Sequence, residues 1–416
     1  MTTPERHHAI VIVGGGAAGT TVAALLRKAK PDLDIAIIEP SEYHYYQPAW
    51  TLVGGGCYSA EATRRQTADL IPPGAKWIKT RAAGFDPQTN TVLLEDGSRV
   101  RYDFLVTAAG LQINWGKIQG LESALGKNGV TSNYQYDLAP YTWECIRQLR
   151  GGKALFTQPA MPIKCAGAPQ KILYLAADHF RRNGVQAELS FLLPGAAMFG
   201  VPFYSQALDK VVANYGITAR YAHNLVAVDG PKRKATFEVT ANNEKKQVTL
   251  EFSMLHVVPP QSAPDFIKTS PLADASGWVS VDKHSLQHTQ FSNVFGLGDC
   301  TTTPNSKTAA AVRAQAPVAA ANLLRQLSGS GEARKYDGYA SCPLTTSKGK
   351  IMLAEFGYDG VVMPSFALDP RIPRRRYWLL KKYYLPNLYW KMLRGNLGPD
   401  WHAKRDFPAA VPDFVP

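Results

Sequence analysis

Long apolar segments and cysteines are both scarce in this sequence of 416 residues. No apolar run reaches the roughly 18 residues that a membrane-spanning helix needs, so we predict no such helix. Five cysteines in a chain of this size exclude the disulfide framework of a small secreted protein, and any disulfide is expected to be catalytic. No signal or transit segment precedes the first predicted strand, which favours a cytoplasm-like compartment.

Acidic residues are fewer than basic ones, 33 against 46, which gives a formal net charge of +13. Such an excess predicts an anionic partner: a nucleic acid, an anionic lipid surface, or an anionic substrate or cofactor. The basic residues crowd into residues 371–416, where no nucleic-acid recognition module accompanies them. We therefore predict no nucleic-acid partner, and the sequence also predicts no metal site.

The N-terminal residues have the pattern of a dinucleotide-binding βαβ unit. A strand at 9–13 precedes three glycines, a helix at 20–28 and a strand at 34–38 that ends at an acidic residue. The first glycine permits a tight turn, the second admits a pyrophosphate, and the third packs helix on strand. The helix N-terminus then faces phosphates, and the acid faces a ribose hydroxyl. The predicted contacts are Gly14, Gly16, Ala17, Ala18, Gly19 and Glu39.

Two later segments favour FAD over NAD as the dinucleotide. Residues 102–110, which end in Ala109 and Gly110, resemble the second FAD-contact strand of flavoproteins with two dinucleotide domains. Residues 293–299 resemble their third contact, in which Asp299, after Gly298, is expected to bind the ribityl chain. A strand-end carboxylate anchors a hydroxyl there, and the next helix N-terminus favours negative charge on a reduced flavin.

A second glycine fingerprint is missing near residue 160, where relatives that use NADH carry one. Residues 158–171 instead form a proline-rich turn that contains a cysteine. We therefore predict an α/β protein with two Rossmann-like domains, the second without nicotinamide binding. The expected boundaries are 1–150 and 266–335 for the FAD domain, 151–265 for the second domain, and 336–416 for a C-terminal region.

Six strings spread over the chain resemble sulfide:quinone oxidoreductases, above all the group that includes the mitochondrial enzyme. They are YQPAWTLV (46–53), KCAGAPQK (164–171), HVVPP (256–260), GDCT (298–301), SKTAAAV (306–312) and YDGYASCP (336–343). The resemblance implies an FAD enzyme that oxidises hydrogen sulfide, reduces a membrane quinone, and passes sulfane sulfur to a thiol, sulfite or growing polysulfide. We expect a bacterial relative on the inner face of the cytoplasmic membrane, with a cytoplasmic location as the alternative.

This resemblance implies that Cys165 and Cys342 meet beside the flavin as a redox-active pair. Hydrosulfide attacks one sulfur of an oxidised pair, leaves a persulfide there, and releases the other cysteine as a thiolate. The resemblance implies the persulfide on Cys342, with Cys165 facing the flavin. Lys164 and Lys171 flank Cys165 and either hold the thiolate or are solvated surface lysines. The remaining cysteines are expected to serve packing: Cys57, Cys145 and Cys300.

The resemblance also places residues around the flavin and the quinone. Pro48 and Lys307 are expected at the flavin, and Lys381 at a quinone oxygen. Two further residues are expected in the wall of the quinone pocket, Phe356 and Tyr383. Residues 374–395 mix cations with Trp, Tyr and Leu, which predicts two short amphipathic helices, broken at Pro386, on an anionic membrane surface.

Three alternative functions fit part of the same pattern. A type II NADH:quinone oxidoreductase would share the fold and the quinone, but it requires the second glycine motif. The flavin subunit of a flavocytochrome c sulfide dehydrogenase would leave the basic aromatic tail without a purpose. A flavin-stabilised partner-binding protein would hold a flavin that sulfide does not reduce. A homo-oligomer is compatible with each of these functions.

Overall fold

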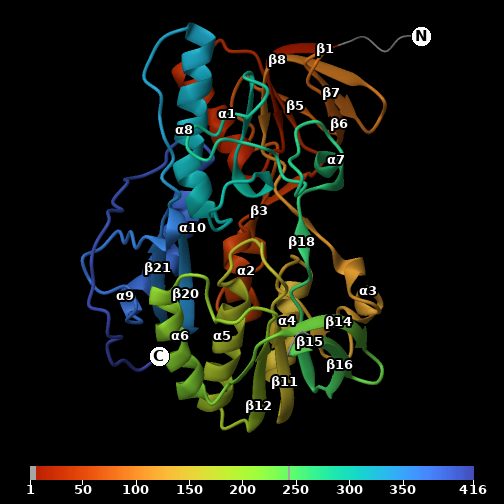
Figure 1. Cartoon of the computed structure of the whole chain (residues 1–416), viewed down its shortest axis with the longest axis vertical. Helices are drawn as coiled ribbons and strands as arrows, with labels where there is room; N and C mark the ends of the chain where they lie inside the picture. The colour runs from red at the N-terminus through yellow and green to blue at the C-terminus, as the bar shows by residue number, and fades with distance from the viewer. Residues whose placement is uncertain (1–5, 242–243) are drawn as a thin grey trace.

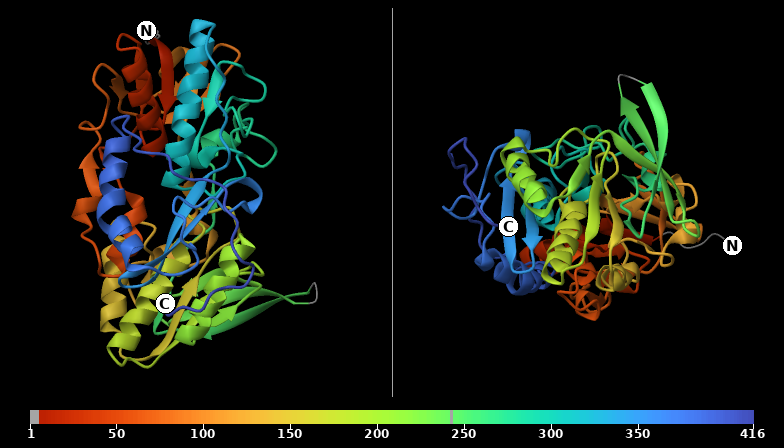
Figure 2. Two further views of the ribbon diagram at one scale, coloured as in Figure 1. Left: turned by 90° about the vertical axis from the view of Figure 1, so that its left-hand side faces the viewer. Right: turned by 90° about the horizontal axis from the view of Figure 1, so that it is seen from below.

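The computed structural model describes residues 6–241 and 244–416 of the chain. Two α/β units are stacked along its long axis, and the C-terminal region lies along their side (Figure 1). The left view in Figure 2 shows the same two units from the side. Each unit has its own mainly parallel sheet, which confirms the predicted α/β class with two Rossmann-like units.

The first sheet has the order β5-β2-β1-β8, with β19 also parallel to β8 and an antiparallel arm formed by β7 and β6. Helices α1 (Ala17–Ala29) and α8 (Ala309–Ser328) pack against each other and against this sheet. Residues 10–13 of β1 are all buried, as expected for a parallel strand covered on both faces. The strands are β1 (Arg6–Val13), β2 (Ile35–Ile38), β5 (Lys76–Ile78), β6 (Ala82–Asp86), β7 (Thr91–Leu94), β8 (Arg99–Thr107) and β19 (Val294–Gly296).

The second sheet has the order β10-β17-β11-β12-β13 and is parallel throughout. Its strand β10 (Val130–Thr131) precedes residue 151, so the second unit takes in chain that the sequence assigned to the FAD domain. A separate antiparallel meander, β14-β15-β16, follows β13. The other elements are β11 (Gly152–Thr157), β12 (Ala187–Leu192), β13 (Thr218–Arg220), β14 (His223–Asp229), β15 (Lys234–Ala241), β16 (Glu244–Glu251), β17 (Met254–His256), α4 (Leu138–Gln148), α5 (Ala168–Arg182) and α6 (Pro202–Tyr215).

The chain crosses between the units twice, and the two crossings pair with each other. Strand β9 (Gln112–Ile113) leaves the first unit and pairs antiparallel with β18 (Gln261–Ser262), which returns to it. Short elements join the larger ones: β3 (Tyr43–Tyr45), α2 (Trp50–Gly54), β4 (Arg64–Gln66), α3 (Leu121–Ala124) and α7 (Asp265–Lys268).

A hairpin of β20 (Ala340–Ser347) and β21 (Lys350–Phe356) opens the C-terminal region and packs on α5 of the second unit. Cys342 and Leu344 of β20 lie in one buried cluster with residues of α5. The hairpin thereby brings a cysteine from the C-terminal region to the start of α5, where Cys165 lies.

Residues 375–392, which come after the hairpin and a connecting segment, form continuous helical structure. They comprise α9 (Arg375–Leu379), a π-helical turn (Leu380–Tyr384) and α10 (Leu385–Met392). The predicted break at Pro386 is wrong, because this proline lies in the first turn of α10, where its missing N–H costs little. The π-helical turn is a local widening of the kind often found at functional sites, and it contains the buried Lys381.

The last residues of the chain run back over the second unit, and a buried arginine fastens them there. Arg371 is fully buried, pairs with Asp369 at 2.8 Å, and donates to the carbonyl oxygens of Pro408 and Ala409. Part of the basic tail therefore stabilises the fold and does not face a membrane. Across residues 6–241 and 244–416, no helix combines the length and the apolar character that crossing a bilayer requires.

Candidate functional site

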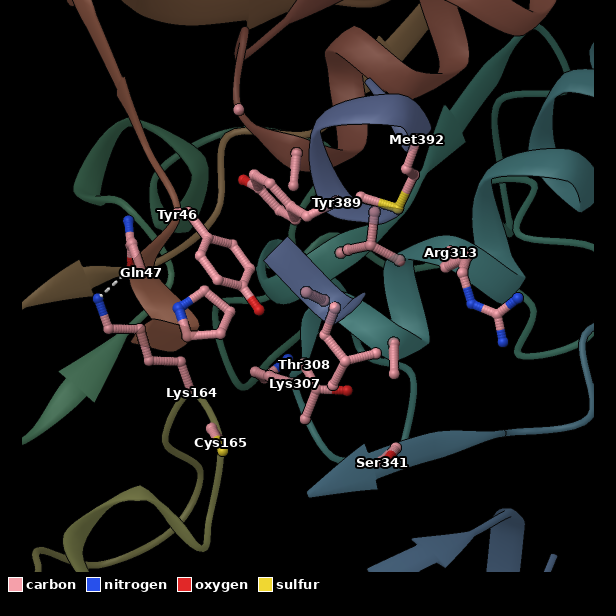
Figure 3. A pocket seen from close by; sticks show the side chains of 18 of the residues that line it. Tyr46, Gln47, Lys164, Cys165, Lys307, Thr308, Arg313, Ser341, Tyr389 and Met392 are labelled. Carbon is pink, nitrogen blue, oxygen red and sulfur yellow. Dashed lines mark hydrogen bonds between the residues drawn. The ribbon is translucent and has the colours of Figure 1, made fainter. Parts of the chain in front are cut away.

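A cavity of about 530 Å³ lies where the first unit, the second unit and the C-terminal helices meet. The glycine loop between β1 and α1 lines one end, and the loop before α5 and the C-terminal hairpin line the other. Figure 3 shows Tyr46, Lys164, Cys165 and Tyr389 around this space. Of the residues that the sequence predicted, the cavity is lined by Gly14, Gly16, Ala17, Ala18, Glu39, Pro48, Ala109, Gly110, Cys165, Lys171, Gly298, Asp299, Lys307 and Lys381.

The three fingerprint glycines meet different steric demands. A Cβ on Gly14, where φ is +106°, would lie 2.4 Å from the Ala108 oxygen, and one on Gly19 would lie 1.9 Å from the Gly14 oxygen. A Cβ on Gly16 would meet no heavy atom within 4 Å. Gly14 and Gly19 are needed by the fold, whereas Gly16 leaves open space in front of α1. The first turn of α1 has no capping side chain and no acidic residue, so its N–H groups suit a phosphate.

Glu39 is held at the end of β2 by backbone donors. Its Oε2 accepts from the Gly15 N–H and its Oε1 from the Ser41 N–H, both at 2.8 Å. The carboxylate also lines the cavity, so it is fixed in place for a ribose hydroxyl. The fixed Glu39 carboxylate fits the adenosine ribose of FAD, and the N–H groups at the start of α1 fit its pyrophosphate.

Asp299 and Lys307 also line the cavity. Burial raises the pKa of Asp299, although Lys307 and Lys164 oppose the shift. The Lys307 ammonium donates to the Thr301 carbonyl oxygen at 3.0 Å and lies 4.2 Å from the Trp278 ring centre. Its backbone oxygen accepts the N–H of Cys165 at 2.7 Å, so Lys307 ties the flavin-side loop to the cysteine loop.

A valine at position 16 tests whether this cavity holds the dinucleotide. Gly16 has φ −72°, which any residue adopts, so we expect Gly16→Val to fold while its side chain fills the phosphate space. FAD affinity is expected to fall at least about 100-fold, measured as flavin bound per protein after dialysis. The exposed Gly200, which also has open space around it, provides the matched control, Gly200→Val. Equal flavin content in both variants would place the cofactor elsewhere.

Cys165 and Cys342 are brought together, with their sulfur atoms 3.8 Å apart and no bond between them. Cys165 lines the cavity, whereas Cys342 is fully buried behind it and lies 3.8 Å from the Ser306 hydroxyl oxygen. Cys165 has a φ of +50°, unusual for a residue with a side chain, and Lys307 holds this conformation through its carbonyl oxygen. One sulfur of the pair therefore lies in the cavity wall, and the other lies directly behind it.

Lys171 reaches this pair from the first turns of α5. The lysine is buried, and its ammonium donates to the Cys165 sulfur at 3.0 Å, so it is not a solvated surface lysine. The hydrogen bond from the Cys342 thiol, together with Lys171 and Lys381, holds the pKa of Cys165 well below its ordinary value, despite burial. The same pairing raises the pKa of Cys342. One thiolate and one thiol are thus the favoured reduced forms.

Lys164 lies beside the pair but makes different contacts. Its ammonium donates to the Gln47 side-chain oxygen at 2.6 Å and lies over the rings of Trp50 and Tyr134 (Figure 3). It is a positive charge at the cavity wall that does not contact a sulfur.

The other cysteines do not line the cavity. Burial raises the pKa of Cys57, Cys145 and Cys300, which keeps all three as thiols. Cys300 is fully buried under the Asp299 turn, and Cys57 donates to the Gly55 carbonyl oxygen at 3.2 Å. Packing accounts for these positions.

The residues predicted for the quinone separate in space. Lys381 lines the cavity, where its ammonium donates to the Pro343 carbonyl oxygen and the Thr345 hydroxyl, each at 3.1 Å. Phe356 points instead into the core of the second unit, where its ring contacts Phe199. Tyr383 is 57% exposed. Neither of these two aromatic residues lines the cavity, because strand alternation turns Phe356 inward and the helix turns Tyr383 outward.

Several residues that line the cavity were not predicted. They include a tyrosine and a tryptophan from the C-terminal region, and a glutamate on β21: Tyr384, Trp401 and Glu355. Glu355 is the single charged residue of the apolar run 351–356, and that pattern is the signal that would have found it. Tyr384 and Trp401 lie among many aromatic residues and carry no comparable signal.

Comparison with known proteins decides the family. A family model described as pyridine nucleotide-disulphide oxidoreductase matches residues 8–140. The mitochondrial sulfide:quinone oxidoreductase of Dictyostelium discoideum is 48% identical over 397 residues, which cover 94% of this chain and 86% of that protein. The chain belongs to the sulfide:quinone oxidoreductase family. The mitochondrial member from Mus musculus is 41% identical over 88% of this chain and 82% of its own length.

A solved structure of a sulfide:quinone oxidoreductase, from Aquifex aeolicus, has the same fold. It superposes with a TM-score of 0.76 at 20% identity and covers 95% of this chain and 93% of its own. Membership of the family confirms the predicted enzyme class and FAD as the cofactor. The named mitochondrial relatives are eukaryotic and lend no support to a bacterial origin, which stays a prediction.

Proposed function

We propose that this sulfide:quinone oxidoreductase oxidises hydrogen sulfide at Cys165 and Cys342 and reduces a membrane quinone from the same cavity. The observation that carries this proposal is the sulfur pair at the cavity wall. The two sulfur atoms lie 3.8 Å apart, and the Cys165 sulfur accepts a hydrogen bond from Lys171. FAD, when bound, accepts two electrons from the cysteine side and delivers them to the quinone.

The charges around the pair favour Cys342 of the oxidised pair as the sulfur that hydrosulfide attacks, so hydrosulfide has to pass Cys165 to reach this buried cysteine. The new bond joins the hydrosulfide sulfur to Cys342, the bond between the cysteines breaks, and its electron pair leaves on Cys165. A thiol with a lower pKa is the better leaving group, and Lys171 stabilises the Cys165 thiolate. The persulfide is then on Cys342, and the thiolate faces the cavity, as the family resemblance implied. Transfer of the outer sulfur to an acceptor returns Cys342 to a thiolate. The bond between the cysteines then re-forms, and the two electrons that this releases would be taken up by bound FAD.

The wall of the cavity supports binding of an apolar acceptor near the C-terminal helices. Side chains of the π-helical turn and of the hairpin line this part, among them Leu353, Leu380 and Tyr384. Lys381 is a buried lysine in this wall, and burial holds its pKa well below the ordinary value. We propose that Lys381 hydrogen-bonds a quinone oxygen there.

A covered helix N-terminus in the second unit supports sulfide, rather than NADH, as the electron donor. A Cβ on Gly167, at the start of α5, would lie 2.3 Å from the Leu344 side chain and 3.7 Å from that of Cys342. Strand β20 therefore covers the helix N-terminus at which a nicotinamide dinucleotide would place its phosphates.

An anaerobic sulfide titration tests the proposed function directly. Sulfide is expected to bleach the visible flavin absorbance of the purified protein, and a short-chain quinone is expected to restore it. NADH is expected to have no effect. A flavin that ignores sulfide and is bleached by NADH would make the protein an NADH:quinone oxidoreductase. Bleaching without recovery on quinone addition would point to another electron acceptor.

We also propose that one face of helical residues 375–392 rests on an anionic membrane surface. Leu379 and Tyr383 are 50% and 57% exposed, and the exposed Arg375 and Arg376 accompany them. Buried Trp378 and Tyr389 belong to the protein core, so only the outer face of the predicted amphipathic segment suits this contact. The side of the membrane stays a prediction, with the inner face of a bacterial membrane as the expectation.

Substitution of the exposed pair tests this contact. We expect Leu379→Ser with Tyr383→Ser to weaken binding to anionic liposomes at least about tenfold, since the apolar area that inserts is lost. Sulfide-dependent flavin bleaching should be unchanged. Tyr221, which is 37% exposed in the second unit, gives the matched control, Tyr221→Ser. Co-sedimentation with liposomes measures all three proteins, and equal binding would show that another surface makes the contact.

A further inference from the structure

Glu355 is a buried carboxyl group in the cavity wall that the proposed sulfide chemistry does not use. It lies on β21, is 3% exposed, and lines the cavity. Its Oε1 accepts hydrogen bonds from the Tyr339 hydroxyl at 2.5 Å and the Ser365 hydroxyl at 2.6 Å, and its Oε2 accepts the Ser365 N–H at 2.9 Å. Burying a carboxyl group is costly, and one aimed at a reaction cavity is a candidate for proton transfer.

Tyr339 connects this carboxyl group to a second titratable group near solvent. The ring of His402 stacks on the Tyr339 ring with centres 3.9 Å apart, and its Nε2 lies 3.1 Å from an Asp337 oxygen. Asp400 pairs with the other ring nitrogen at 2.5 Å. The side chains of Asp337 and Asp400 are 49% and 64% exposed, so the stack extends from the cavity wall to solvent.

Opposing effects act on the pKa of Glu355. Burial raises its pKa, while hydrogen bonds from Ser365 and Tyr339 and the charge of His402 lower it. Burial disfavours the charged ring of His402, but Asp337 and the neighbouring aspartate raise its pKa on balance. Because its pKa is raised, the Glu355 carboxyl group holds a proton more readily than a free carboxyl group does. The nearby cation of His402 stabilises the carboxylate once that proton is lost.

Other elements packed around Glu355 add few charges. From α6, the Tyr204 hydroxyl bonds to the backbone of Glu355. On α9, burial raises the pKa of Tyr377, and the charge of Glu355 adds a smaller effect in the same direction. Arg313 of α8 lowers the pKa of Tyr339 but contributes less than burial. The carboxyl group is thus governed mainly by Tyr339, Ser365 and His402.

We propose that Glu355 is the proton donor to a quinone oxygen during quinone reduction in this cavity. The proposal rests on the proposed function. Reduction to a quinol adds two electrons, which come from sulfide through the cofactor, and two protons. Glu355 supplies one proton by breaking its O–H bond, and solvent supplies the other. Hydrogen bonds from Ser365 and Tyr339 and the charge of His402 stabilise the resulting carboxylate, which regains a proton from solvent.

Stopped-flow reoxidation of the reduced protein tests this role. The holoenzyme and Glu355→Gln are reduced with sulfide, or with dithionite, and mixed with a short-chain quinone over a range of pH. We expect reduction by sulfide to stay within about twofold and reoxidation by quinone to slow about 100-fold. In the unchanged protein the reoxidation rate should fall as pH rises through the pKa of Glu355 and should show a solvent deuterium isotope effect. The variant should lose both features.

Matched variants separate proton donation from support of the loop that carries Ser365. Exposed Glu122 does not line the cavity, and Glu122→Gln should leave every rate unchanged. Tyr339→Phe keeps the carboxyl group but removes a bond that lowers its pKa, so the fall in rate should move to higher pH. This variant keeps the test decisive if Glu355→Gln does not fold.

The outcomes for Glu355 and for the proposed function are distinguishable. A reoxidation rate within about twofold of the original for Glu355→Gln, with the pH profile and isotope effect unchanged, would overturn the proton donor. An unshifted profile in Tyr339→Phe would do the same. Failure of sulfide to bleach the unsubstituted protein would instead overturn the proposed function, while dithionite reduction still measures the reoxidation step.

Discussion

Cys165→Ser and Cys342→Ser are each expected to abolish reduction of the flavin by sulfide while the protein keeps its FAD. The two sulfur atoms lie 3.8 Å apart, so removal of either leaves no disulfide for hydrosulfide to attack. We expect the rate of flavin bleaching by sulfide to fall by at least about 10³-fold in each variant, measured by anaerobic stopped-flow absorbance. Flavin content should be preserved, because serine matches cysteine closely in size and neither sulfur anchors the glycine loop.

Cys57→Ser provides the control for the cysteine pair. Cys57 is buried but does not line the cavity, so its replacement should change the bleaching rate by no more than about twofold. Both variants of the pair should still be reoxidised by quinone at the normal rate after chemical reduction with dithionite. Near-normal bleaching in either Cys165→Ser or Cys342→Ser would rule out the pair as the site of sulfide oxidation.

Lys171→Met is expected to slow sulfide oxidation in a manner that depends on pH. The lysine donates to the Cys165 sulfur at 3.0 Å, and its charge helps to lower the pKa of that cysteine. Without the charge the pKa of Cys165 rises, so Cys165 becomes a poorer leaving group and is more readily protonated. We expect the bleaching rate to fall at least about tenfold near neutral pH and to recover as pH rises through the new pKa.

Methionine fills the space of the buried lysine, so the fold should be retained, and the thermal midpoint checks this point. Lys171→Arg keeps a cation and should show a much smaller loss with little change in the pH profile. A uniform loss at every pH in Lys171→Met would mean that the lysine shapes the loop and does not stabilise the thiolate.

The C-terminal region shows one limit of sequence patterns. Residues 374–395 have the composition of a membrane-surface segment, yet Trp378, Lys381 and Tyr389 are buried. Composition counts side chains, whereas their direction depends on how the helix packs against the hairpin. Deleting residues 371–416 would therefore remove part of the cavity wall as well as the exposed face, and substitution is the cleaner test of membrane contact.

The domain boundary at residue 151 shows a similar limit. Strand β10 (Val130–Thr131) joins the second sheet through pairing with β17 (Met254–His256), which lies more than a hundred residues later in the chain. A strand of two residues has no periodicity of its own, so its sheet cannot be predicted locally.

The sequence by itself determined the dinucleotide loop, the α/β class, the family and the two cysteines, because each rests on short strings whose meaning is local. Glycines at fixed spacing dictate a turn wherever they occur. Only the tertiary structure decided that Lys171 contacts the Cys165 sulfur, that β20 covers the start of α5, and that Glu355 faces the cavity. These facts join residues far apart in the chain, and their distances and pKa shifts arise from burial and charge that exist only after packing.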